Sequence, residues 1–367
     1  MLFQDRGVLS PHYVPDMLPN REEYVKKVVE LLKPAEENKK PTNIFIYGKT
    51  GTGKTCTVKK AVSSLKVESV YVNCKIYSTK YRVMQYIAEK LGLIDKIGFG
   101  EAYLYEKLVG YLGGKQLIVV LDEVDGVKEL DELIYMLTRA NDEIKNGGIT
   151  IVGISNNLAF KERLDPRTKS TLYQTELVFP PYDAKQIKDI LMQRIELGKG
   201  KVEEVAVNII AATAAQESGD ARYALQLLSK AVDIAQSEGS ESVGEKAVKE
   251  AKEGVEVDIA KELLNTLPDH AKLVMLAVIR ATGRKALMAG ERSVVSGEVM
   301  EEYLRVCRER GRKPKSGRWV RAYINELEML GFITMKDTSK GLRGQSRYIS
   351  LSVPKEQVIE ALGVSNA

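Results

Sequence analysis

The residues with the clearest chemical role form a glycine-rich loop near the N-terminus. Residues 48–55 read GKTGTGKT and fit the pattern G-x-x-x-x-G-K-[ST]. In this pattern the glycines let backbone N–H groups surround phosphate oxygens, the lysine reaches the β- and γ-phosphates, and the threonine hydroxyl coordinates magnesium. An apolar segment, NIFIY (43–47), precedes the loop, and a helix is expected after it. The sequence therefore predicts a site for ATP or ADP with Mg²⁺, whose candidate residues are Gly48, Lys49, Thr50, Gly51, Thr52, Gly53, Lys54, Thr55 and Cys56.

Two acidic residues end a second apolar segment, QLIVVLDEVD (116–125). A strand buried on both faces delivers its last residues to the edge of the sheet where ligands bind. Asp122 is a candidate magnesium ligand together with Thr55, and Glu123 is a candidate for orienting and deprotonating the attacking water. Taken alone, the pair could also be an acidic turn at the end of a strand.

Two further elements have residues suited to the same site. GITIVGISNN (148–157) ends in Asn156, whose uncharged amide could position the attacking water. In SGDARYAL (218–225), Asp220 is a predicted helix N-cap, so Arg222 falls in the first turn and could reach the phosphates. Taken alone, each element is better explained as a polar turn or a surface arginine.

The elements around these motifs indicate an α/β fold. Up to about Pro181, apolar strand candidates alternate with helical segments, which predicts a parallel sheet with helices on both faces. Beyond that point only helices are predicted until Pro268, where three helices and a β-hairpin indicate a winged helix. We expect an ATPase base domain over residues 1–181, a small all-helical lid domain over 182–267 and a C-terminal winged-helix domain over 268–367.

The net charge of +5 is unevenly distributed along the chain. Residues 268–355 carry 18 Lys/Arg against 9 Asp/Glu, so the remainder is mildly acidic. A basic C-terminal region favours contact with a polyanion, although a solvated basic face would have the same composition. No apolar run approaches the roughly 20 residues needed to span a bilayer, so no membrane association is expected. The three cysteines are far apart in sequence, and we expect a reducing, cytoplasmic location.

The most basic stretch, residues 305–321, leads into the third helix of the predicted winged helix. Ser316 is the expected N-cap, and Val320, Ile324 and Leu327 mark the core face. The N-terminal residues of such a helix enter the major groove. The candidate contacts to double-stranded DNA are therefore Ser316, Arg318 and Arg321 on this helix, and Lys340, Arg343 and Arg347 on the wing. Trp319 and Tyr323 are expected in the core, and a protein-docking role for the domain remains an alternative.

Taken together, these motifs resemble those of an AAA+ ATPase. The whole chain resembles the archaeal replication initiator family, which is related to eukaryotic origin recognition complex subunit one and cell division control protein six. The segments that carry the resemblance are YVPDMLPNREE (13–23), YGKTGTGKT (47–55), VVLDEVD (119–125), VGISNN (152–157), LDPRTKSTL (164–172), VFPPYDAKQIKDIL (178–191) and GDARYAL (219–225).

The resemblance implies a role for several residues at the nucleotide. Asn156 would be sensor one and Arg222 sensor two, and Arg167 would be an arginine finger acting on a neighbouring subunit. Contacts to the adenine and ribose would come from Val14, Pro15, Arg21 and Tyr182.

The resemblance also implies partners and a biological role. Residues 74–92 would be an insertion that contacts DNA through Ser78, Lys80 and Arg82. The protein would bind replication origins, hydrolyse ATP slowly, retain ADP and help recruit the MCM helicase, with a paralogous initiator as a further candidate partner. The alternatives are another AAA+ machine such as a clamp loader, a transcriptional or initiation regulator with the same winged helix, and a permanently ADP-bound DNA-binding paralogue.

Overall fold

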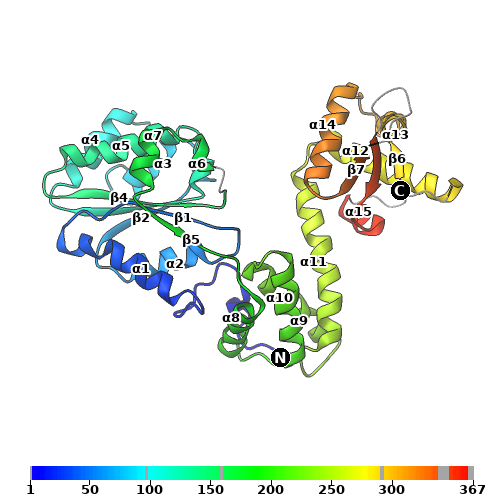
Figure 1. Ribbon diagram of the computed structural model, residues 1–367, viewed down its shortest axis with the longest axis horizontal. Coiled ribbons are helices and arrows are strands. Elements are labelled where there is room, and N and C mark those ends of the chain that lie inside the picture. Colours follow the sequence, from blue (N-terminus) through cyan, green and yellow to red (C-terminus); the bar gives the residue numbers. More distant parts are fainter. Residues whose placement is uncertain (1, 96–97, 158–159, 290–292, 338–346, 363–367) are drawn as a thin grey trace. The chain divides into compact units, whose positions relative to one another are not determined.

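The structure is a computed structural model that describes residues 2–95, 98–157, 160–289, 293–337 and 347–362 (Figure 1). The chain divides into two compact units, Met1–Val248 and Lys249–Ala367, and each contains hydrophobic clusters of its own. None of the helices in the described part of the chain combines the length and apolar character that a bilayer span requires.

A five-stranded parallel sheet lies at the centre of the first unit. Its strands are β1 (Ile44–Tyr47), β2 (Glu68–Asn73), β3 (Gln116–Asp122), β4 (Gly148–Ser155) and β5 (Thr175–Val178). They lie side by side in the order β2-β3-β4-β1-β5, and each neighbouring pair is parallel. Every residue of β3 and β4 is buried, because helices cover both faces of a parallel sheet. The predicted α/β fold is confirmed.

Helices cover the two faces of this sheet (Figure 1). They are α1 (Glu22–Leu32), α2 (Lys54–Ser63), α3 (Lys80–Lys90), α4 (Glu101–Tyr111), α5 (Leu130–Glu143), α6 (Phe160–Arg163) and α7 (Pro166–Leu172). Alternate strand residues serve opposite faces: Ile44 and Ile46 pack with α1 and α2, whereas Phe45 packs with α3, α4 and α5. Successive side chains of a strand point to opposite faces of the sheet, so each face has its own hydrophobic cluster.

The edge strand β5 was not expected from the sequence. It pairs with β1, with Leu177 opposite Ile46. Of its four residues only Leu177 is buried, so TELV lacks the apolar run by which the other strands were recognised. An edge strand pairs on one side only, and its side chains need less apolar character than those of a central strand.

Three helices follow the sheet and form a small bundle within the same unit: α8 (Ala184–Leu197), α9 (Glu204–Glu217) and α10 (Ala221–Ser237). Asp183 and Gln186 make a reciprocal capping box at the start of α8. Gly219, with φ of 66°, ends α9 in the left-handed conformation that glycine adopts at little cost. Asp220 then accepts a hydrogen bond from the Arg222 N–H and begins α10, as predicted.

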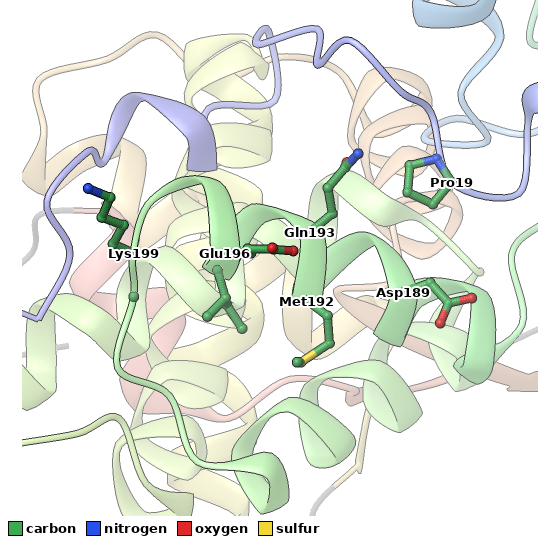
Figure 2. Close-up of a pocket in the computed structure, with 8 residues that line it drawn as sticks. Pro19, Asp189, Met192, Gln193, Glu196 and Lys199 are labelled. Carbon is green, nitrogen blue, oxygen red and sulfur yellow. The ribbon is translucent and has the colours of Figure 1, made fainter.

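The N-terminal segment packs on α8. Lys201 N donates to Leu2 O at 2.9 Å, and Gln4 N donates to Gly198 O at 2.9 Å. The buried Arg194 of α8 donates to the carbonyl oxygens of Val8 and Tyr13. Figure 2 shows a hollow beside this packing, lined by Pro19 from the N-terminal segment and by α8 side chains that include Met192 and Gln193. The first residues of the chain are thus held by the helical bundle.

The second unit contains the predicted winged helix. Its elements are the greater part of α11 (Glu245–Thr266), then α12 (Asp269–Ala289), β6 (Ser293–Val295), α13 (Ser296–Glu309), α14 (Gly317–Met329), β7 (Ile333–Asp337), β8 (Arg347–Leu351) and α15 (Lys355–Leu362). The strands form an antiparallel sheet in the order β6-β8-β7. The sequence predicted α12, α13, α14 and the β7–β8 hairpin, but not β6 or α15. β6 has only three residues, and only Val294 of them is buried.

Candidate functional site

The glycine-rich loop connects β1 to α2 and has the backbone that phosphate binding requires. Gly51 and Gly53 have φ of 67° and 87°, which residues with a side chain adopt only with strain. A Cβ atom at Gly48 would lie 2.3 Å from the Phe179 carbonyl oxygen, so this position has no space for a side chain. Gly51 and Gly53 are therefore required by their positive φ, and Gly48 by the close approach of the Phe179 backbone.

Lys54 is buried at the start of α2 and its ammonium group turns back onto the loop. Its Nζ donates to Gly48 O at 2.7 Å and to Lys49 O at 2.6 Å. Burial, and secondarily the positive charge of Arg222, lower the Lys54 pKa to about 8. Three carboxylates, those of Asp122, Asp220 and Glu123, act in the opposite direction. A phosphate group is the ligand that would best stabilise the charged form of this lysine.

The two candidate magnesium ligands are already in contact. Thr55 Oγ1 donates to Asp122 Oδ2 at 2.8 Å, and the Tyr71 hydroxyl donates to the same carboxylate oxygen. Burial and then the hydrogen bond to Asp122 raise the pKa of Tyr71, which stays a donor. Sequence reasoning missed Tyr71. Its partner is set by the β2–β3 pairing, in which Asn73 lies opposite Asp122.

Thr55 and Asp122 fit a magnesium ion that is shared with a nucleotide. Both offer oxygen atoms, and Mg²⁺ is usually bound by one or two carboxylates together with substrate phosphates and water. Among the described residues, no cluster of three or more His, Cys, Asp or Glu side chains could form a metal cage. Thr55 and Asp122 supply two oxygen donors, which fits a cation that a nucleotide also coordinates.

The ends of β1, β3 and β4 meet at the same edge of the sheet. Tyr47, just before the loop, is opposite Ser155, and Asp122 is opposite Ile154. This register brings Glu123 and Asn156 to the edge that carries the glycine-rich loop. Asn156 is partly exposed. The turn that carries it is fixed by Ser155, whose Oγ donates to Asp125 Oδ1 at 2.6 Å.

The helical bundle touches the loop through the start of α10. Ala221 N donates to Gly51 O at 3.2 Å. A Cβ atom at Gly51 would lie 1.6 Å from Asp220 Oδ1, so the carboxylate rests directly on the loop. Arg222 is half-exposed and close enough for its charge to affect Lys54. The sequence placed Asp220 only as a helix cap, and the contact with Gly51 depends on tertiary packing.

Arg21 joins the loop, the sheet edge and the bundle. Its side chain is buried, with Nε donating to Thr52 O at 2.9 Å and Nη2 donating to Pro180 O at 2.7 Å. The guanidinium carbon lies 3.9 Å from the centre of the Tyr182 ring. Burial lowers the pKa of Arg21. In this structure the Arg21 guanidinium therefore contacts the Tyr182 ring and the backbone of the loop.

The other predicted nucleotide contacts lie beside the bundle. Pro15 is buried and Val14 half-buried, in the N-terminal segment that Arg194 attaches to α8. Arg194 also influences Cys56, whose pKa is raised by burial and lowered by the arginine charge. The N-terminal segment, α8 and the first turn of α2 are therefore close together.

The predicted arginine finger lies elsewhere on the first unit. Arg167 is exposed in the first turn of α7, which Asp165 caps. It lines a hollow together with side chains of α4 and α5, among them Glu101, Tyr135 and Asp142. None of the glycine-rich-loop residues is among the residues that line that hollow.

The predicted DNA contacts in residues 74–92 differ in their exposure to solvent and in their existing partners. The Lys80 ammonium is held by Glu101 at 2.9 Å and Glu132 at 2.6 Å, and its side chain is only 16% exposed. Arg82 is exposed on α3, whereas Ser78 is half-buried and its carbonyl accepts from Lys128 N. Of the two cations, Arg82 is therefore better placed to meet a phosphate.

In the second unit, the start of α14 presents basic side chains to solvent. Arg318 and Arg321 are exposed, and Ser316 occupies the N-cap position without a side-chain capping bond. The buried Tyr303 accepts a hydrogen bond from Lys315 N at 3.0 Å, which fixes the approach to the helix. On the wing, Arg347 is exposed, whereas Lys340 and Arg343 lie outside the described residues.

Trp319 is 56% exposed at the start of α14, contrary to the expectation that it belongs to the core. Val320, Ile324 and Leu327 are the buried residues of this helix. One residue before Val320, Trp319 therefore falls off the buried stripe and next to the basic face. Tyr323 is half-buried beside the core, as expected.

Comparisons with known proteins agree with this architecture. Residues 37–159 match the AAA domain, residues 188–253 the Cdc6 AAA+ ATPase-type lid domain, and residues 262–361 the CDC6 C-terminal winged-helix domain. The ORC1-type DNA replication protein 1 of Sulfurisphaera tokodaii is 39% identical, covering 98% of this chain and 93% of that protein. The chain belongs to the ORC1/Cdc6 family of DNA replication proteins.

Two further relatives support this membership. The ORC1-type DNA replication protein of Pyrococcus abyssi is 41% identical, covering 96% of this chain and 88% of that protein. The solved structure of Aeropyrum pernix ORC1 in complex with DNA is 39% identical and has a TM-score of 0.83, covering 98% of this chain and 96% of that one. The family resemblance stated from the sequence is confirmed.

Replacing Arg21 tests whether it holds the loop. Arg21→Ala removes the donors to three buried or half-buried carbonyl oxygens and leaves a cavity beside Tyr182. We expect the free energy of unfolding of the first unit to fall by on the order of 3 kcal/mol. Guanidinium denaturation followed by circular dichroism measures it, with Arg163→Ala, an exposed arginine of the same unit, as control. Equal stability of the two variants would contradict the assignment.

The lowered pKa of Lys54 makes nucleotide affinity dependent on pH. Below about pH 8 the ammonium is charged in the empty loop, and above it the lysine must first take up a proton. A bound phosphate raises the pKa again, so affinity should fall by roughly tenfold per pH unit above that value. Titration calorimetry in two buffers of different ionisation enthalpy should show proton uptake on ATP binding. If the affinity for ATP stayed the same one pH unit above this value and no proton were taken up on binding, the prediction would be contradicted.

Proposed function

We propose that this protein is an ATP-dependent, origin-binding initiator of DNA replication. In this proposal it is a slow ATPase that binds ATP or ADP with Mg²⁺, whose bound nucleotide acts as a switch, and that helps recruit the MCM helicase. The observation that carries the proposal is the contact of the lid helix α10 with the glycine-rich loop, in a chain that also bears a basic winged helix. Family membership supports the replication role.

The nucleotide roles follow from the contacts of the first unit. Lys54 would exchange its two carbonyl partners for phosphate oxygens, and Thr55 with Asp122 would hold the magnesium ion. Arg222 and Asp220 belong to the bundle but lie next to the loop. Phosphates that enter the loop would attract Arg222 and repel Asp220. The angle between bundle and base would therefore depend on the nucleotide. Asn156 would position the attacking water, and Val14, Pro15 and Tyr182 would border the adenine.

The proposed partners are double-stranded origin DNA, the MCM helicase and a paralogous initiator on adjacent DNA. Arg318, Arg321 and Ser316 would contact the major groove, and Arg347, Lys340 and Arg343 would contact the backbone from the wing. Arg82 would add a contact from the first unit, and Arg167 would act on the nucleotide of a neighbouring subunit. We propose three domains, over residues 1–181, 182–267 and 268–367, and a cytoplasmic location alongside the chromosome.

Duplex binding in defined nucleotide states tests the proposal. Fluorescence anisotropy would compare fragments tiled across the host's candidate origins with a scrambled duplex, at physiological salt, with ADP and with a non-hydrolysable ATP analogue. Preference for a few origin fragments, with an affinity that differs between the two nucleotides, is expected. Uniform weak binding to all fragments would instead favour another AAA+ machine with a docking winged helix.

Glu123→Gln tests the hydrolytic role. The variant should bind ATP as the wild type does and lose hydrolysis by a factor of roughly 10²–10⁴, because the amide cannot accept the water proton. Steady-state phosphate release measures the rate, with Lys54→Ala as the variant that should not bind ATP at all. The exposed Glu106→Gln on α4 serves as the charge-matched control. Undiminished turnover would remove Glu123 from this role.

Arg318→Ala combined with Arg321→Ala tests the DNA face. Losing two phosphate or base contacts should weaken duplex binding and reduce the slope of log affinity against log salt by about 1–2. Anisotropy titrations over a range of salt concentrations measure both quantities. Lys272→Ala on α12, whose ammonium donates to the Asn265 carbonyl oxygen, removes a charge from the same unit and should leave the slope unchanged. Unaltered affinity of the double variant would exclude α14 as the reading helix.

A further inference from the structure

The only tryptophan of the chain is exposed at the start of α14. Trp319 is 56% exposed, and it lies in the first turn of the helix that we propose for the major groove. Arg318 and Arg321 are also exposed, and the first turn contains no acidic residue. The Trp319 ring is not part of the hydrophobic cluster of the second unit, so packing of that core does not account for it.

The Trp319 ring is held in place by its own helix. Trp319 N donates to Ser316 O at 2.9 Å, and the next residue, Val320, is buried. The centre of the Trp319 ring lies 6.1 Å from that of Tyr323, one turn further along, with 31° between the ring planes. Tyr323 in turn packs against the hydrophobic cluster of the unit. One side of the indole is therefore supported by protein, while the rest of it is presented to solvent.

The tryptophan borders the exposed face of α14. Arg318, Ala322 and Asn325 are exposed at spacings of four and three residues, so they share one face, away from the buried residues of this helix. Trp319 follows Arg318 and lies about 100° further around the helix, at one side of that face. The small Ala322 side chain allows the helix to approach base edges closely. When this face enters the major groove, Trp319 meets the bases at one side of the groove.

We propose that Trp319 is a specificity-determining contact, whose indole packs against the C5-methyl group of a thymine in the major groove. This inference rests on the proposed function, because it concerns the DNA ligand of α14. Thymine presents an apolar methyl group in the major groove, whereas the other base edges present hydrogen-bond donors and acceptors. An uncharged ring gains from covering that methyl group, while Arg318 and Arg321 bind phosphates or polar base edges. The second unit thereby prefers sites with a thymine at the position that Trp319 meets.

The surroundings of Trp319 fit DNA better than a protein partner. A protein-docking face gathers several apolar side chains into one patch. In the described part of this unit, the other exposed large apolar residues are Met329, ten positions or about 15 Å further along α14, and Tyr348 on β8. Residues 305–321, by contrast, carry eight basic residues and one glutamate. A single aromatic ring in a cationic segment suits a contact with a polyanion.

Fluorescence of the full chain tests the contact directly, because Trp319 is its single tryptophan. Acrylamide quenching is measured for the protein alone, with the tightest-binding duplex of the tiled fragments, and with one strand of that duplex. Saturating duplex should lower the quenching constant by about half, since the exposed part of the ring becomes covered. An unchanged constant would overturn the contact. Stronger protection by the single strand than by the duplex would also refute it, because the ring would then stack on unpaired bases.

Replacing thymine by uracil tests the recognition of the methyl group, which is all that uracil lacks. Anisotropy compares wild type and Trp319→Ala on the same duplex with uracil at each thymine position in turn. At the contacted position, uracil should weaken wild-type binding by about fourfold, the effect of burying one methyl group. Trp319→Ala should bind the thymine duplex roughly tenfold more weakly than wild type and should not respond to uracil. Trp319→Phe, which keeps an apolar ring, should retain part of the response.

Met329→Ala is the matched control. Met329 is 87% exposed at the other end of the same helix, so its loss removes apolar surface without changing the first turn. This variant should bind the thymine and uracil duplexes as the wild type does. Thermal unfolding followed by circular dichroism checks that the affinities compare folded proteins. An equal response to uracil in wild type and in Trp319→Ala would contradict recognition of the methyl group by Trp319.

Failure of the proposed function has a different signature. If the wild type binds no duplex, the DNA role fails, and this inference fails with it. If the wild type prefers a few origin fragments and Trp319→Ala binds them with the same affinity and the same response to uracil, only this inference fails. In that case α14 reads its site through other side chains, and the origin-binding role is unaffected.

Discussion

A buried lysine ammonium is the constraint around which the first unit is built. A cation removed from water is stabilised only by oxygen atoms placed close to it, and Lys54 has the carbonyl oxygens of Gly48 and Lys49. Those two carbonyls belong to a loop whose shape depends on glycines at positive φ. Three carboxylates, from the sheet edge and from the bundle, add negative potential. Burial outweighs these carboxylates and lowers the pKa of Lys54.

The same constraint links the bundle to the sheet. Asp220 lies against Gly51 and the Ala221 N–H bonds to the Gly51 carbonyl, so α10 starts on the loop. On the other side, Arg21 bridges Thr52 and Pro180 while stacking on Tyr182. These contacts use the loop backbone, whose shape the nucleotide must also fit. The loop is thus in contact with both sides of the connection between sheet and bundle.

The second unit follows a simpler physical logic. Its core is a single apolar cluster. Its positive charge is concentrated in residues 305–321, which lead into the first turn of α14. Tyr303 connects the apolar core to this basic region. Its ring is buried, and its hydroxyl forms hydrogen bonds with the Lys315 backbone and the His270 ring. The basic residues around α14 are thereby presented by a rigid support. That arrangement suits recognition of a polyanion, in which backbone contacts set the position and side chains on one helix set the specificity.

The sequence by itself determined the features that depend on local pattern. The glycine-rich loop, the buried strands β3 and β4, the capping at Asp183 and Asp220, and the core face of α14 all follow from residue spacing, and the structure has each of them. Tertiary structure decided what depends on pairing between distant segments. β5 buries one side chain and was visible only through its pairing with β1. Tyr71 at Asp122, Lys80 between two glutamates and Lys75 at Glu123 each join residues at least 21 positions apart, and no spacing rule connects them. Side-chain partners at the edge of a parallel sheet depend on which strands become neighbours, and such strands are separated in sequence by long crossover connections.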